Sequence, residues 1–142
     1  MGATSEHFSD NELSCHHCGV NECKPALVAA LEDFRRLLGK PIIVIDAYRC
    51  LDHNKAAGGV GASQHCLGVA ADIRVKGMSA ADLYRASRNV PAFRGLGRND
   101  AGYSLHVDLR GEFAQWCYGP DGKWCHWFPL PDEGEGKGNV NA

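Results

Sequence analysis

Three features that would point to particular partners are missing from the sequence. No apolar run approaches the ~20 residues of a transmembrane helix, so no membrane-spanning segment is expected. The net charge is only −2, which gives no electrostatic reason to expect binding to nucleic acid or to an anionic membrane. Residues 1–10 lack the basic stretch followed by an apolar stretch of a Sec signal peptide, so we expect synthesis in the cytoplasm and, if the protein is exported, another route.

The size and composition are those of an ordinary globular domain. Of the 142 residues, 44% are hydrophobic and 23% are charged, which allows one substantial apolar core. We expect residues 1–130 to form a single domain. Residues 131–142 contain mainly Gly, Glu, Asp and Asn and offer little to bury, so they are predicted to be a flexible polar tail.

Seven cysteines are many for this length, and the odd number leaves at least one outside any disulfide within the chain. Cys15 and Cys18 form a C-x-x-C motif around two histidines, and Cys23 follows. Such a motif binds zinc when a second ligand pair completes the site, but Cys23 offers only one ligand. A disulfide or free thiols are therefore favoured over a second metal site. Cys117 and Cys125 are predicted to face each other across a β-hairpin, where they could form a disulfide.

The hydrophobic periodicity predicts both helices and strands. Residues 24–38 are predicted to form the main helix, with a proline in the first turn and a glycine after the last. Residues 42–45 are all β-branched and predict a buried central strand. A capping box at residues 79–82 predicts a helix that continues to about residue 89. Residues 50–62 and 93–103 are predicted to be glycine-rich loops.

Two further predicted strands carry metal-binding side chains. In residues 69–75 the alternation places Asp72 opposite the apolar side chains, and in residues 105–110 it does the same for His106. If these strands are neighbours, Asp72 and His106 share the polar face of a sheet, close to His65. Two histidines, one acid and an open fourth position are typical of a catalytic zinc site. We therefore expect an α+β fold: a small central antiparallel sheet that carries a zinc site on one face and is flanked by helices.

The combined motifs resemble a known family. They are S-x-H-x-x-G-x-A-x-D at 63–72, Tyr48-Arg49, His53-Asn54 and H-x-D at 106–108. This combination is similar to the M15 peptidases, which are zinc D-Ala-D-Ala carboxypeptidases and related peptidoglycan endopeptidases, with a zinc site like those of lysostaphin-type enzymes and the Hedgehog signalling domain. The resemblance extends from about Phe8 to Trp116. It implies that His65, Asp72 and His106 bind one zinc ion per chain and leave the fourth position to water.

The resemblance also implies a set of residues around the substrate. Arg49 matches the arginine that binds substrate and stabilises the developing oxyanion, although a surface salt bridge is the alternative. Ser63 and Gln64 are expected to support substrate binding by hydrogen bonds, whereas Gly68 is expected to be structural.

The general base is the point where the sequence departs from the family. Many relatives have Glu or Asp three residues before the last histidine ligand, but here that residue is Tyr103. Tyrosine, with an ordinary pKa of ~10, is a poor base at neutral pH. Asp108 shares a strand face with His106 and is the first candidate for the base. It could instead orient His106 or pair with Arg110. More distant candidates are His53, Asp100 and His126.

The implied function is zinc-dependent hydrolysis of an amide bond in the murein stem peptide. A compact catalytic domain without a signal peptide favours an endolysin-like L-Ala-D-Glu endopeptidase, released by a holin-type route to act in the periplasm or cell wall. A D-Ala-D-Ala carboxypeptidase is the alternative within the family. A non-catalytic zinc-bearing domain for cell-wall binding or signalling is an alternative of another class. We expect a monomer whose partners are peptidoglycan stem peptides.

Overall fold

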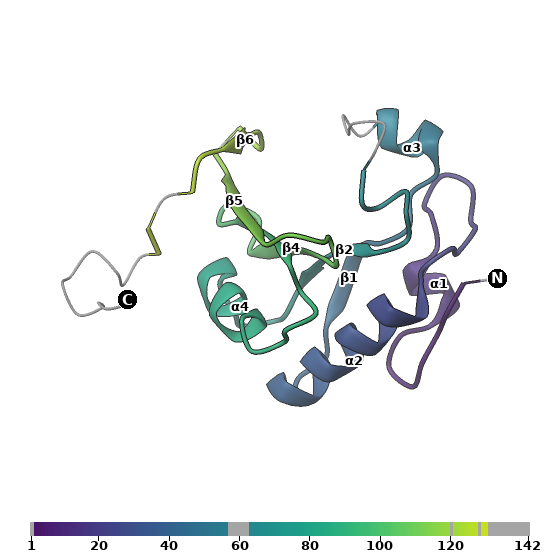
Figure 1. Ribbon diagram of the computed structural model, residues 1–142, viewed down its shortest axis with the longest axis horizontal. Coiled ribbons are helices and arrows are strands. Elements are labelled where there is room, and N and C mark those ends of the chain that lie inside the picture. The colour runs from purple at the N-terminus through teal and green to yellow at the C-terminus, as the bar shows by residue number, and fades with distance from the viewer. Residues whose placement is uncertain (1, 57–62, 120, 128, 131–142) are drawn as a thin grey trace.

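One six-stranded sheet forms the centre of the protein (Figure 1). The computed structural model describes residues 2–56, 63–119, 121–127 and 129–130. The strands are β1 (Ile43–Asp46), β2 (Ala70–Arg74), β3 (Gly95–Asn99), β4 (Ser104–Asp108), β5 (Ala114–Tyr118) and β6 (Trp124–Cys125), in the order β1-β2-β4-β3-β5-β6. Neighbouring strands are antiparallel except for the parallel pair β3 and β5. The predicted α+β class with a mainly antiparallel sheet is confirmed.

Capping interactions define at least one end of three of the described helices. The helices are α1 (Asp10–Leu13), α2 (Pro25–Leu38), α3 (Leu51–Ala56) and α4 (Ala80–Ser87). As predicted, α2 has a proline in its first turn and ends at Gly39, which adopts the left-handed conformation and donates its N–H to the Arg35 carbonyl. The predicted capping box between Ser79 and Asp82 is present at the start of α4, which ends two residues earlier than expected.

The two faces of the sheet have different tasks. Helices α2 and α4 cover one face (Figure 1) and enclose the apolar core, with the Phe34 and Phe93 rings edge to face at 5.6 Å. Because side chains alternate along a strand, Ile73, Leu105 and Val107 point into this core and their neighbours in sequence point to the opposite face. That opposite face carries Asp72 and His106, the polar side chains that the sequence analysis proposed as metal ligands.

Strand β1 does not lie in the centre of the sheet, contrary to the sequence prediction. It is at the end of the strand order and, within the described residues, pairs with β2 alone. Ile43 and Ile45 are 42% and 40% exposed. β-branched side chains favour an extended backbone, but that preference does not distinguish an edge strand from a central one.

Both predicted glycine-rich loops contain regular structure. Helix α3 occupies the first part of residues 50–62, and β3 lies within residues 93–103. The glycines of β3 provide space, because a Cβ at Gly95 would overlap the Asp108 carboxylate and one at Gly97 would overlap the Trp116 indole.

Residues 131–142, predicted to be a flexible tail, lie outside the described part of the chain. Among the described helices, none combines the length and the apolar composition that a membrane span requires.

Candidate metal centre

His65, Asp72 and His106 meet on the polar face of the sheet. Strands β2 and β4 are neighbours, which was the condition for Asp72 and His106 to share a face, and Asp72 is the direct register partner of His106. His106 Nδ1 lies 3.1 Å from Asp72 Oδ1, and His65 Nε2 lies 3.5 Å from Asp72 Oδ2. Tetrahedral zinc with Zn–N and Zn–O distances of ~2.0–2.1 Å separates its ligand atoms by about 3.3 Å. The three side chains therefore have the spacing of a zinc ligand set.

Hydrogen bonds on the outer side of each imidazole orient both rings. His65 Nδ1 donates to the Ala47 carbonyl at 2.7 Å, and His106 Nε2 donates to Asp108 Oδ2 at 2.7 Å. Since a carbonyl and a carboxylate can only accept, each ring directs its other nitrogen toward Asp72. His65 Nε2 is buried and makes no hydrogen bond within the described part of the chain. The donor set of two nitrogens and a carboxylate therefore fits Zn²⁺.

The electrostatics of the group favour a cation at its centre. Burial alone would raise the pKa of Asp72, but the hydrogen bond from His106 and the nearby His65 imidazole hold it well below its usual range. Burial lowers the pKa of His106, but the Asp108 and Asp72 carboxylates outweigh that effect and raise it to about 8. A negative charge is thus maintained between the two imidazoles, where a metal ion can replace a shared proton.

Asp108 is fully buried and both of its carboxylate oxygens are engaged. Arg110 Nε donates to Oδ1 at 2.9 Å, and Arg110 Nη2 donates to Oδ2 at 2.7 Å. Burial opposes the charged form of Asp108, but the bonds from Arg110 and His106 hold its pKa below the usual range. The Arg110 guanidinium lies 4.8 Å from the Trp116 ring centroid, and this ring is 5.2 Å from the His106 ring. These are the contacts of a carboxylate that orients His106, which is the alternative role that the sequence left open.

Two of the candidate metal ligands, Asp72 and His106, border a cleft of about 340 Å³. Its polar lining also includes Asp46, Arg49, Asn99, Ser104 and Tyr118. Arg49 Nε lies 3.2 Å from Asp46 Oδ2, and Asp46 Oδ1 is buried without a hydrogen bond from any described residue. Among the described residues of the lining, Asp46 and Asp72 are the carboxylates. The sequence analysis did not select Asp46, although an acid directly after a strand and just before the Tyr48-Arg49 motif was a usable signal.

The predicted substrate-binding residues occupy different positions. Arg49 lines the cleft. Ser63 Oγ accepts a hydrogen bond from the His65 backbone N–H at 3.1 Å, and the Gln64 carbonyl accepts two bonds from backbone N–H groups later in the same turn. Neither Ser63 nor Gln64 is among the residues that line the cleft. They shape the turn that carries His65, and their contact with substrate remains a prediction.

Tyr103, at the position where many relatives have an acid, is not directed into the cleft. It lies in the turn between β3 and β4, with φ at 53° and 62% of its surface exposed. The more distant candidates are not among the described residues of the lining either: Asp100 forms an ion pair with Arg98 at 2.9 Å, and His126 lies beyond β6. The side chain of His53 is outside the described part of the chain.

Comparison with known proteins gives a family match over most of the chain. A family model described as Peptidase M15 matches residues 6–108. The matched range contains all three candidate metal ligands and ends at Asp108. A search of the curated proteins found no match to the chain.

Proposed function

The chain belongs to the M15 peptidase family, and from this premise we propose that it is a zinc-dependent hydrolase of amide bonds in peptidoglycan stem peptides. The observation that carries the proposal is the convergence of His65, Asp72 and His106, with Asp72 and His106 lining a cleft. The hydrogen bonds on the outer side of both imidazoles support a site prepared for a metal ion.

The protein supplies charge and orientation around the reacting amide. When bound, zinc polarises a carbonyl and lowers the pKa of a water molecule. Arg49 provides a fixed positive charge in the cleft, and its ion pair with Asp46 limits the positions of the guanidinium. Such a group binds a substrate carboxylate and stabilises negative charge that develops on the scissile carbonyl.

We propose Asp46, in place of Asp108, as the general base. Asp46 lines the cleft and has one oxygen without a hydrogen bond from the described residues, whereas both oxygens of Asp108 are occupied. A base must be within hydrogen-bonding reach of the proton that it accepts, and Asp46 is part of the cleft lining whereas Asp108 is not. Asp46 then passes this proton to the leaving amine.

The proposed bond is that between L-Ala and D-Glu, as in the stem endopeptidases that the sequence motifs resemble. The D-Glu residue has a carboxylate next to this bond, which the Arg49 guanidinium can bind. Arg49 would also suit the terminal carboxylate of a D-Ala-D-Ala substrate, and this observation keeps the carboxypeptidase as the second candidate. In either case the proposed place of action is the cell wall.

Digestion of defined muropeptides distinguishes these functions. Zinc-loaded protein is incubated with purified muropeptides, and the fragments are identified by mass spectrometry. We expect a disaccharide that retains only L-Ala and a released peptide that begins with D-Glu. Release of D-Ala alone would establish the carboxypeptidase instead. If protein with zinc bound releases no fragment, the non-catalytic zinc-bearing domain for cell-wall binding or signalling would be favoured. His106→Ala, which lacks one metal ligand, is the inactive control.

A further inference from the structure

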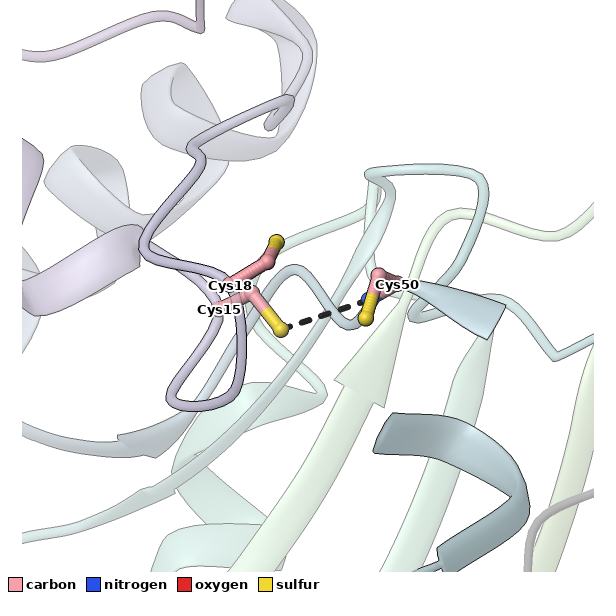
Figure 2. Close-up of side chains that lie close together, drawn as sticks. All are labelled: Cys15, Cys18 and Cys50. Atoms are coloured by element: carbon pink, nitrogen blue, oxygen red, sulfur yellow. Dashed lines mark hydrogen bonds between the residues drawn. The ribbon is translucent and has the colours of Figure 1, made fainter. Parts of the chain in front are cut away.

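A second cluster of metal-binding side chains lies where the loop after α1 meets the segment between β1 and α3. The sulfur atoms of Cys15, Cys18 and Cys50 all lie within 4.8 Å of one another. In Figure 2 the side chains of Cys15 and Cys50 extend toward each other from these two segments. A nitrogen ligand is close by, because His17 Nδ1 is 3.4 Å from Cys50 Sγ.

The backbone around the cluster is arranged for thiolate ligands. The Cys15 sulfur accepts hydrogen bonds from the backbone N–H groups of His17 and Cys50, each at 3.4 Å, and Figure 2 marks the second of these. The Gly19 N–H donates to the Cys15 carbonyl at 2.8 Å and closes a tight turn around the C-x-x-C motif. Hydrogen bonds from N–H groups to sulfur stabilise the negative charge that a metal-bound thiolate carries.

We propose that Cys15, Cys18, Cys50 and His17 form a second, structural zinc site. Three thiolates and one imidazole complete a tetrahedral shell without an open position, which is the composition of a structural site. With Zn–S distances of ~2.3 Å, the sulfur atoms of such a site are about 3.8 Å apart. For the three sulfur atoms, the observed limit of 4.8 Å therefore requires side-chain movements of at most about 1 Å.

The other cysteines near this cluster are not ligands. Cys23, which the sequence suggested as the additional ligand, is buried in the core and directs its sulfur to the Leu13 carbonyl at 3.6 Å. Burial raises its pKa to about 11, which disfavours the thiolate. Cys66 is half-buried and outside the group of sulfur atoms that lie close together. The ligand that the sequence analysis missed is Cys50, which lies far from the motif in sequence but next to it in space.

The second site would connect the N-terminal loop to the catalytic cleft. Cys50 directly follows Arg49, and the Arg49 N–H donates to the carbonyl of the metal ligand His65 at 3.3 Å. A metal ion that fixes Cys50 therefore restrains the segment from which Arg49 reaches the cleft. The site holds this segment in place and takes no part in the chemistry.

The test counts metal ions and identifies thiolate ligands in the full chain. Protein purified under reducing conditions from zinc-supplemented medium is analysed for zinc by mass spectrometry. We expect two zinc ions per wild-type chain and one in Cys50→Ser and in Cys18→Ser. Cys66→Ser, the matched cysteine control outside the cluster, retains two. In cobalt-substituted wild-type protein we expect the intense near-ultraviolet absorption of thiolate-to-cobalt charge transfer.

The outcome is independent of the proposed peptidase activity. In cobalt-substituted His106→Ala the thiolate absorption persists although the first site has lost a ligand, and in Cys50→Ser it disappears. Equal zinc contents of the wild type and Cys50→Ser, or cobalt-loaded protein without thiolate absorption, would overturn the second site. So would a disulfide among Cys15, Cys18 and Cys50, detected by peptide mapping of protein purified without reductant.

Discussion

At the scale of single residues, the structure separates two carboxylates that have different tasks. Asp108 is proposed to position His106, and Asp108→Asn removes the negative charge and one of the two acceptor oxygens that hold His106 and Arg110. We predict that zinc affinity falls by roughly 10- to 100-fold. Competition with a chelator of known affinity measures this loss. Turnover recovers when zinc is supplied in excess, whereas an unchanged affinity would contradict the positioning role. Asp33→Asn, an exposed acid on α2, serves as the matched control.

Asp46→Asn is predicted to behave in the opposite way. The amide cannot accept the proton, so kcat on a muropeptide falls by roughly 10²- to 10⁴-fold, while the zinc content stays at the wild-type level. Steady-state kinetics and metal analysis on the same sample separate the two effects. Near-normal turnover of Asp46→Asn would rule out this base and return attention to Asp108.

The sequence alone pointed to the candidate metal ligands that the structure brings together, but not to their surroundings. Asp72 and His106 could be found because each interrupts an apolar strand, and alternation along a strand is a local rule. Asp46 could not be assigned to a face in this way, because the register between β1 and β2 shifts between Val44 and Asp46. Cys50 was missed because its proximity to Cys15 and Cys18 depends on the tertiary fold.

At the scale of secondary-structure elements, the turn that carries His65 depends on Gly68. This residue has φ at +77°, and a Cβ there would overlap the Glu22 carbonyl. Its own carbonyl accepts a hydrogen bond from the Lys24 N–H at 2.9 Å. We predict that Gly68→Ala lowers the free energy of unfolding by about 3 kcal/mol, from backbone strain together with the overlap. Urea denaturation measures the change.

Gly77→Ala is the matched control for Gly68→Ala. Gly77 has φ at +84°, but a Cβ there would have no neighbour within 4 Å among the described residues. Its cost is therefore the backbone strain alone, about 1 kcal/mol. Equal losses in the two variants would show that the contact with Glu22 contributes nothing.

The N-terminal segment is attached to α2 through Glu32. Its carboxylate accepts hydrogen bonds from Ser5 Oγ at 2.5 Å, the His7 N–H at 2.7 Å and His7 Nδ1 at 2.8 Å. Burial opposes the charge, but these bonds lower the pKa of Glu32 from 4.5 to about 2. Because the folded-state pKa lies below the unfolded one, the stabilisation is complete well above pH 4.5 and is lost as the pH falls toward 2.

We therefore predict that Glu32→Gln lowers the free energy of unfolding by about 1 kcal/mol at pH 7, with a smaller difference from wild type below pH 4. Denaturation curves at several pH values test this prediction, with Glu112→Gln at an exposed position as control. A difference that does not depend on pH would contradict the assigned role of the carboxylate.

The position of an element in the sheet was less predictable than its existence. The β-branched side chains of β1 predict a strand, but only the pairing order shows that this strand lies at an edge of the sheet. The glycines of β3 led to the prediction of a loop. They are needed instead because Asp108 and Trp116 on neighbouring strands occupy the space that larger side chains would fill. Such constraints come from strands distant in sequence, so local patterns do not contain them.

At the scale of the whole molecule, stability and chemistry are on opposite faces of one sheet. The core between the sheet, α2 and α4 contains the large apolar side chains, and the candidate metal ligands lie on the other face. The fold should therefore persist when metal is removed. After treatment with a chelator we expect unchanged far-ultraviolet circular dichroism and a lower melting temperature, since bound metal stabilises the native state by linkage. Loss of native secondary structure at room temperature would contradict this division.

Zinc-dependent amide hydrolysis tests the central claim most directly. Chelated, folded protein is titrated with zinc, and the release of stem-peptide fragments from purified muropeptides is followed by mass spectrometry. We predict no release without metal, recovery as zinc occupies the His65, Asp72 and His106 site, and no recovery in His106→Ala. Full hydrolysis by the metal-free protein, or none by the zinc-loaded wild type, would contradict the assignment of a zinc peptidase.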